Sequence, residues 1–245
     1  EGYGMFAVVE YAAGTPNLNY IDRTRIGATG HSAGGNAAIR GANFFGKQAI
    51  ETGQPSKLHS VFVSGYVLTL REDVLEDVRS NVGVSYAFYD EGAYRNELKN
   101  GDMRYAPEAI RAVNSGIRFH GKSIEEVELG CYYGSKQDRT LRIVHNERVL
   151  HPFQPYIVEA TANQIEYFER VFEIDSGMAN DDQVWYWKEL LGLISLIAAV
   201  VAVIPMGRLL LVMSWFRPLV HPLPPALALP TGRGQGVCWC GVVGG

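Results

Sequence analysis

The sequence predicts an α/β fold, in which a mostly parallel sheet is flanked by helices and followed by one membrane-spanning helix near the C-terminus. Two observations lead to this prediction. Short β-branched or apolar runs alternate with longer helical segments up to residue 172, a pattern typical of parallel sheets. The 17 residues from 190 to 206 then carry no charge, and this length is at the lower limit for crossing the hydrocarbon of a bilayer.

The expected strands are short and apolar, and each is bounded by polar or turn-forming residues. Helices are expected where apolar residues recur at helical spacing, and the helix that starts at Gly34 is expected to end near Gly46. The expected strands are 25–29, 58–67, 82–89 and 141–145, the expected helices are 1–13, 34–45, 71–80, 107–113 and 155–172, and an extended segment is expected at 125–133.

Composition narrows the functional classes. The chain has 245 residues, of which 47% are hydrophobic, so it can build one sizeable core. A net charge of −4 gives no electrostatic basis for binding nucleic acid. The three cysteines, Cys131, Cys238 and Cys240, give neither a disulfide framework nor a zinc spacing. No nucleotide-binding or metalloprotease motif occurs, so no cofactor and no metal are expected.

The segment 190–216 has the features of a membrane span. An aromatic cluster at 185–187 precedes it, and Arg208, Arg217 and Arg233 lie beyond its apolar centre. Basic residues favour the cytoplasmic side, so the preceding domain is expected on the extracytoplasmic side of the membrane. The alternative is a buried C-terminal helix of a soluble domain. The expected organisation is a catalytic-type domain over 1–175, a transmembrane segment over 183–217 and a disordered or truncated tail over 218–245.

One motif carries chemistry. Gly30-His31-Ser32-Ala33-Gly34 has the form G-x-S-x-G and lies between an apolar run and a helical run rich in small residues. At such a strand–turn–helix junction the serine backbone is strained and its hydroxyl stands at the carboxyl end of a strand. The alternative is a glycine-rich turn in which Ser32 only caps the following helix.

The segment from Asp22 to Gly35 resembles the nucleophile elbow of α/β-hydrolases, particularly the dienelactone-hydrolase-like and acetyl-esterase-like groups. The resemblance covers 1–172, which corresponds to the C-terminal half of the family's catalytic domain. It implies a partial α/β-hydrolase fold whose N-terminal strands are missing. In the family a second oxyanion donor comes from a loop upstream of the elbow, so the chain alone is expected to be weakly active or inactive.

On this fold the catalytic residues follow one another as serine, acid and histidine. Asp90, with Glu91 as the alternative, directly follows the expected strand 82–89. His151, with His145 as the alternative, follows the expected strand 141–145. The backbone amide of Ala33 would donate to the oxyanion. Four histidines are weaker candidates for the base by position: His31, His59, His120 and His221.

The sequence therefore predicts a membrane-anchored serine hydrolase that acts on an ester-type or peptide carbonyl of a small-molecule or peptide substrate through an acyl-enzyme. Two alternatives remain. The chain could be a non-catalytic hydrolase-fold binding module of a membrane protein, or a membrane-tethered structural domain.

Overall fold

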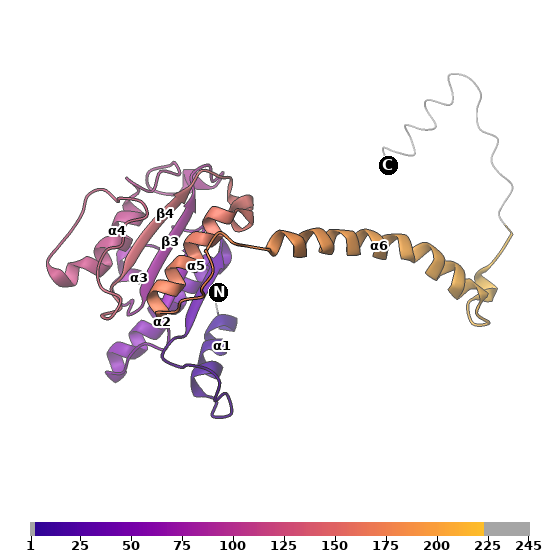
Figure 1. Ribbon diagram of the computed structural model, residues 1–245, viewed down its shortest axis with the longest axis horizontal. Coiled ribbons are helices and arrows are strands. Elements are labelled where there is room, and N and C mark those ends of the chain that lie inside the picture. The colour runs from indigo at the N-terminus through magenta and orange to yellow at the C-terminus, as the bar shows by residue number, and fades with distance from the viewer. Residues whose placement is uncertain (1–2, 223–245) are drawn as a thin grey trace, which may run out of the picture. The chain divides into compact units, whose positions relative to one another are not determined.

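The computed structural model describes residues 3–222, which divide into two units between Gln183 and Val184 (Figure 1). The first unit contains a sheet with its helices, and the second contains one long helix. Arg233, Cys238, Cys240 and most of the segment expected to be a tail, 218–245, lie outside the described residues.

The first unit is built on a four-stranded sheet in which all strands are parallel, as predicted. The strands lie in chain order, β1-β2-β3-β4, so each pairs with its neighbour in sequence. The order makes β1 and β4 the two edges. The strands are β1 (Gly27–His31), β2 (Ser60–Ser64), β3 (Asn81–Ala87) and β4 (Arg142–Glu147).

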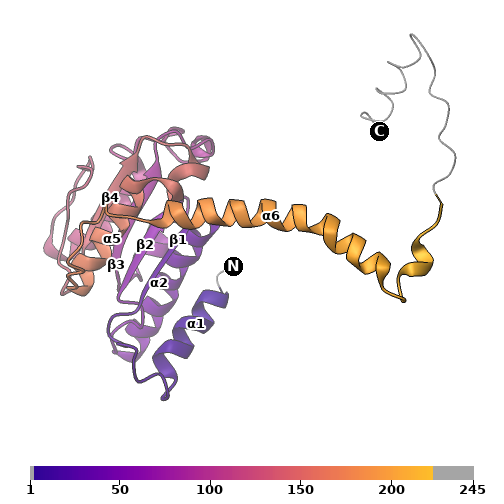
Figure 2. The same cartoon turned by 45° about the vertical axis from the view of Figure 1, so that its right-hand side comes forward.

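Helices cover both faces of this sheet (Figure 2). Crossovers between parallel strands are right-handed, and here every crossover advances in the same direction, so the connecting helices fall on one face. The helix that follows the last strand covers the other face. The first face carries α1 (Tyr3–Gly14), α2 (Ala33–Thr52), α3 (Glu72–Leu75) and α4 (Pro107–Ile117), and the second carries α5 (Val158–Phe172).

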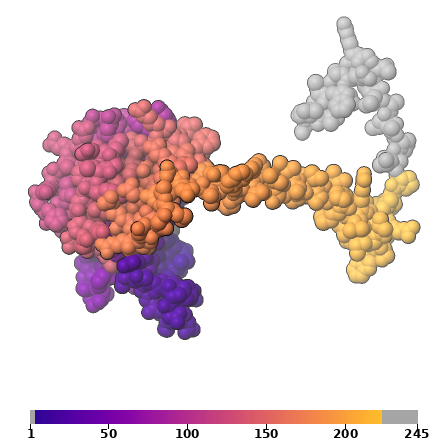
Figure 3. Space-filling model, in the orientation of Figure 1, coloured from indigo at the N-terminus to yellow at the C-terminus, as the bar shows by residue number. Residues whose placement is uncertain are grey.

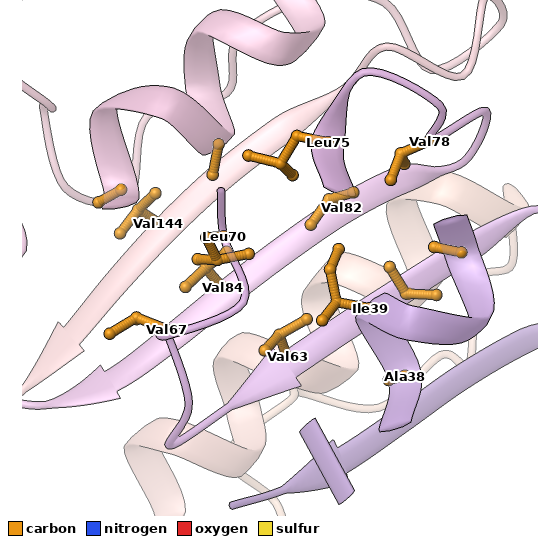
Figure 4. Close-up of a cluster of buried hydrophobic side chains, with 14 of the residues drawn as sticks. Ala38, Ile39, Val63, Val67, Leu70, Leu75, Val78, Val82, Val84 and Val144 are labelled. Carbon is orange, nitrogen blue, oxygen red and sulfur yellow. The ribbon is translucent and has the colours of Figure 1, made fainter. Parts of the chain in front are cut away.

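Two buried clusters hold these layers together. In β2, Val61 and Val63 point into the larger cluster, whereas Phe62 between them points into the smaller one beside Tyr167 of α5. Figure 4 shows the larger cluster, where Ile39 of α2 lies among valines of the strands. This alternation along one strand is the period of two that places successive side chains on opposite faces of a sheet.

Helix α2 is longer than predicted, and the predicted end near Gly46 is wrong. The helix continues to Thr52, and Gly53 follows with φ 66°, the left-handed conformation common after helices. Gly46 is a packing residue, because a Cβ there would lie 1.9 Å from the carbonyl oxygen of Asp77. A tertiary contact therefore explains this glycine, and a sequence pattern gives no sign of it.

Two other segments also differ from prediction. The helix expected over 71–80 is only one turn, and Val74 and Leu75 of that turn are buried in the core. In the segment 125–133, which was expected to be extended, the β-pairing among the described residues is a single bridge between Tyr133 and Arg142. Loops thus occupy more of the chain between α3 and β4 than the sequence predicted.

The second unit contains helix α6 (Trp185–Val212), whose side chains are exposed along its length (Figure 3). Its most apolar 18-residue window has a mean hydropathy of 2.5 and is 0% buried. A helix that is apolar all round and uncovered is typical of a membrane span. Among the described residues, α6 is the one helix long and apolar enough to cross a bilayer.

Candidate active site

Ser32 occupies a strained turn between β1 and α2. Its φ of 57° and ψ of −117° are rare for a residue with a side chain, and such a conformation costs about 1–3 kcal/mol. A hydrogen bond from the Ser32 amide to the carbonyl oxygen of Ser64, 2.8 Å long, ties the turn to the end of β2. The Ser32 side chain makes no capping hydrogen bond to α2. Ser32 is therefore the N-cap residue of α2 by position only, and its hydroxyl makes no hydrogen bond to the helix.

Asp90 and His151 form a hydrogen-bonded pair. The Nδ1 atom of His151 lies 2.9 Å from Oδ2 of Asp90, and the Asp90 side chain is 6% exposed. The other carboxylate oxygen accepts a hydrogen bond of 2.6 Å from the amide of Gly92, which fixes the carboxylate. The neighbouring Glu91 is exposed and has no hydrogen-bond partner for its side chain within residues 3–222. Of the two acids considered, Asp90 is the one next to a histidine.

A buried polar network holds the segment that carries His151. The segment is a 3-10 helix, His151–Tyr156, in which Gln154 is fully buried. Nε2 of Gln154 donates to Ser85 Oγ at 2.7 Å and to Glu147 Oε2 at 3.0 Å. Ser85 lies in β3 and Glu147 ends β4, so the network ties the 3-10 helix to two strands. Sequence patterns do not reveal this network, because its partners lie far apart in the chain.

One open pocket of about 250 Å³ brings together all four residues for which the sequence predicted a role. These are Ser32, Ala33, Asp90 and His151. The other residues around them could not be chosen from the sequence, because they lie in strands, loops and helices without a motif. They are Asn36, Gly65, Tyr66, Val67, Leu68, Tyr86, Gly92 and Arg95.

Tyr86 is the most perturbed titratable residue of this pocket. It is 4% exposed, and burial together with the adjacent Asp90 carboxylate raises the pKa of its hydroxyl well above the ordinary value. Tyr86 therefore stays neutral at physiological pH and can donate a hydrogen bond beside the acid. Aromatic residues in predicted strands usually pack in the core, which is why the sequence did not single it out.

The other histidines lie elsewhere or serve as neighbours. His145, the alternative base, is in β4 and packs against Phe62 in the smaller core cluster, with ring centroids 6.4 Å apart. His31 packs against His151, with ring centroids 4.5 Å apart. His59 lies before β2, at the opposite end of the sheet from Ser32. Among these histidines, His151 is the one that both lines the pocket of Ser32 and forms a hydrogen bond with a carboxylate, that of Asp90.

We expect acid to destabilise the first unit. Burial is the largest cause that lowers the pKa of His31, of His59 (to about 4) and of His145. Because the folded pKa lies below that of the unfolded chain, stability is full above about pH 6.5 and falls as the pH drops below it, by up to about 1.4 kcal/mol per pH unit for each fully buried group. Solvent screening reduces this figure for all three histidines, and most for the half-buried His31 and His59.

Urea unfolding followed by circular dichroism at about pH 7.5 and about pH 5 checks this prediction. The His59→Gln variant should lose less stability between the two conditions than the parent chain. The His120→Gln variant, altered at an exposed histidine, serves as the control. Equal losses in the parent chain and the His59→Gln variant would contradict the assignment to His59.

Comparison of the chain with protein-family models, with curated proteins and with solved structures finds no match. Within residues 3–222, no group of three or more histidine, cysteine, aspartate or glutamate side chains could hold a metal ion.

Proposed function

We propose that this chain is a serine hydrolase of the α/β-hydrolase type, that residues 1–175 are part of its catalytic domain, and that it cleaves an ester by way of an acyl-enzyme. The observation that carries the proposal is the shared pocket of Ser32, with its strained backbone and uncommitted hydroxyl, and the hydrogen-bonded pair Asp90–His151. Positive φ at a serine between a strand and a helix supports the role of nucleophile. The parallel strands in chain order, with the serine after β1, the acid after β3 and the histidine after β4, support the fold assignment.

In the proposed mechanism His151 is the general base. As Ser32 Oγ forms a bond to the ester carbonyl carbon, its proton moves to Nε2 of His151, and the Asp90 carboxylate stabilises the imidazolium through Nδ1. The tetrahedral intermediate expels the alcohol, which takes the proton from His151. Water then attacks the acyl-enzyme, gives its proton to His151, and the carboxylic acid leaves as Ser32 regains the proton.

The Ala33 amide is proposed as an oxyanion donor. Ala33 is the first residue of α2, where backbone N–H groups lack partners inside the helix and the helix dipole favours negative charge. Oxyanion holes have at least two donors, and losing one slows the reaction by about 10²–10³. With Ala33 as the single donor we therefore expect slow acylation, so labelling needs an incubation of several hours.

Covalent labelling tests the proposal. The 245-residue chain in detergent is incubated with a fluorophosphonate probe for several hours, and intact mass and peptide mapping report the site of modification. We expect one phosphonyl adduct, on Ser32. The Ser32→Ala variant should lose it, whereas Ser176→Ala, altered at an exposed loop serine, should keep it. A chain that is folded by circular dichroism yet acquires no adduct would favour the non-catalytic binding module.

We further propose that α6 anchors the hydrolase in a membrane, with the first unit on the extracytoplasmic side. The length and hydropathy of α6 support the anchor. The distribution of charge supports this sidedness, because Arg208 and Arg217 lie towards the C-terminal end of the apolar segment, whereas Asp181 and Asp182 precede it.

Replacing Ile197 with arginine should weaken membrane insertion. Ile197 lies near the middle of α6, and an arginine at the centre of a membrane helix costs about 2.5–3.5 kcal/mol on insertion scales. After alkaline extraction, the Ile197→Arg variant should shift from the membrane pellet to the supernatant. Leu219→Arg, which lies beyond α6, is the matched control and should stay in the pellet. Retention of both variants would contradict the anchor.

A further inference from the structure

Arg142 is a buried cation without a counter-charge. It is the first residue of β4 and only 2% exposed. Its Nε donates to Ser115 Oγ at 3.1 Å, and its Nη1 donates to the carbonyl oxygens of Ser80 and Leu141 at 3.0 and 2.9 Å. Among the described residues, Nη2 has no hydrogen-bond partner and no carboxylate pairs with the guanidinium. Burying an unpaired charge costs free energy, so a buried guanidinium is normally paired with an anion.

Three further arginines surround this position without ion pairs. Arg79, Arg118 and Arg139 each donate to backbone carbonyl oxygens, and none pairs with a carboxylate in the described part of the chain. Burial is the largest cause that lowers the pKa of Arg142 to about 10; the charges of Arg118 and Arg79 act in the same direction, and Tyr167 opposes them. The local field is therefore strongly positive.

A pocket of about 280 Å³ opens onto these groups. Arg79, Arg139 and Arg142 line it together with two apolar side chains, Val78 and Phe119, and with the polar side chains of His120 and Thr140. The one acidic residue in its lining is Asp138. Its volume suits a ligand of about one ring and a head group, and its walls offer cationic and apolar surface together.

We propose that this pocket binds a small organic anion, namely an aromatic or short aliphatic carboxylate or phosphate monoester. The anionic group would accept hydrogen bonds from Arg142, and the apolar body would lie against Phe119 and Val78. A planar guanidinium with a free Nη2 suits either head group. The pocket lies at the amino ends of β3 and β4, whereas Ser32 follows the carboxyl end of β1, so this site is separate from the proposed hydrolase site.

Calorimetric titration tests the proposal with defined probes. The full chain in zwitterionic detergent is titrated with benzoate and with phenyl phosphate, and benzamide is the neutral probe of the same shape. We expect both anions to bind, benzamide to bind at least about tenfold more weakly, and added salt to weaken the anions alone. Comparable binding of benzamide and benzoate would show an apolar pocket without anion recognition and would overturn the proposal.

Variants test whether Arg142 is the residue that binds the anion. Arg142→Met keeps the side-chain volume and should lose benzoate binding at least about tenfold, while Asp138→Asn should bind more tightly because a like charge is gone. Arg71→Met, an exposed arginine paired with Asp73, is the matched control and should bind as the parent does. If Arg142→Met does not fold, the Arg79→Gln/Arg139→Gln double variant takes its place. Unchanged benzoate binding in the folded variant would overturn the proposal.

Discussion

In the proposed triad, replacing Asp90 with asparagine is expected to slow the reaction of Ser32 with a fluorophosphonate by about 10³–10⁴. The carboxylate accepts the Nδ1 hydrogen of His151, and this bond leaves Nε2 free to take a proton. An asparagine amide can donate to Nδ1 instead, which would place the hydrogen on Nε2 and leave no base facing the serine. The amide of Gly92 already fixes the other carboxylate oxygen, so the substitution should change the tautomer with little change of position.

The rate constant for fluorophosphonate labelling measures this effect. Glu91→Gln is the matched control, because it removes an exposed carboxylate from the adjacent position. The control should label within about twofold of the parent, as expected for a surface substitution. A larger loss in Glu91→Gln than in Asp90→Asn would transfer the role of the acid to Glu91.

The strands could be located to within about three residues because β2, β3 and β4 each contain a short run of apolar residues between polar ones. The least regular case is β1, which was expected at 25–29 and lies at Gly27–His31. Its glycines and histidine are poor strand formers, so propensity alone placed it two residues too early. The burial of β1 is also weaker than that of β2 and β3, which are buried at every position.

The serine, the acid and the histidine of the candidate site could be predicted, because the fold that the sequence resembles requires them in this order along the chain. Serine, acid and histidine each follow a strand in turn, and the structure brings Asp90 and His151 within hydrogen-bond distance. The support around them was not predictable. Gln154 and Glu147 hold the segment of His151 through hydrogen bonds between distant parts of the chain. The sequence around Tyr86 is that of an ordinary buried strand.

The unusual environment of Arg142 had a sign in the sequence. It is the one charged residue in the expected strand 141–145, where a parallel sheet usually carries apolar residues on both faces. A charge in such a position must find partners in the fold, and here the partners are two carbonyl oxygens and one hydroxyl. What the sequence could not show is that no carboxylate of the described chain would be among them.

The two glycines of the motif should respond to alanine in opposite ways. A Cβ at Gly30 would lie 2.3 Å from the carbonyl carbon of Gly34, so β1 and α2 would have to separate. Because the obstacle is backbone, we expect Gly30→Ala to lower the free energy of unfolding by about 3 kcal/mol or more and to abolish labelling of Ser32. A Cβ at Gly34 would meet nothing within 4 Å.

Gly34→Ala is therefore the matched control, and alanine there should stabilise α2 by about 0.5–1 kcal/mol because glycine is the poorer helix former. Urea unfolding by circular dichroism measures both variants, and fluorophosphonate labelling reports whether the turn keeps its geometry. The contrast separates two explanations of the motif. If close approach of the strand to the helix is the physical requirement, only the first glycine is needed, and equal loss of stability in both variants would show that Gly34 has a packing role that this structure does not contain.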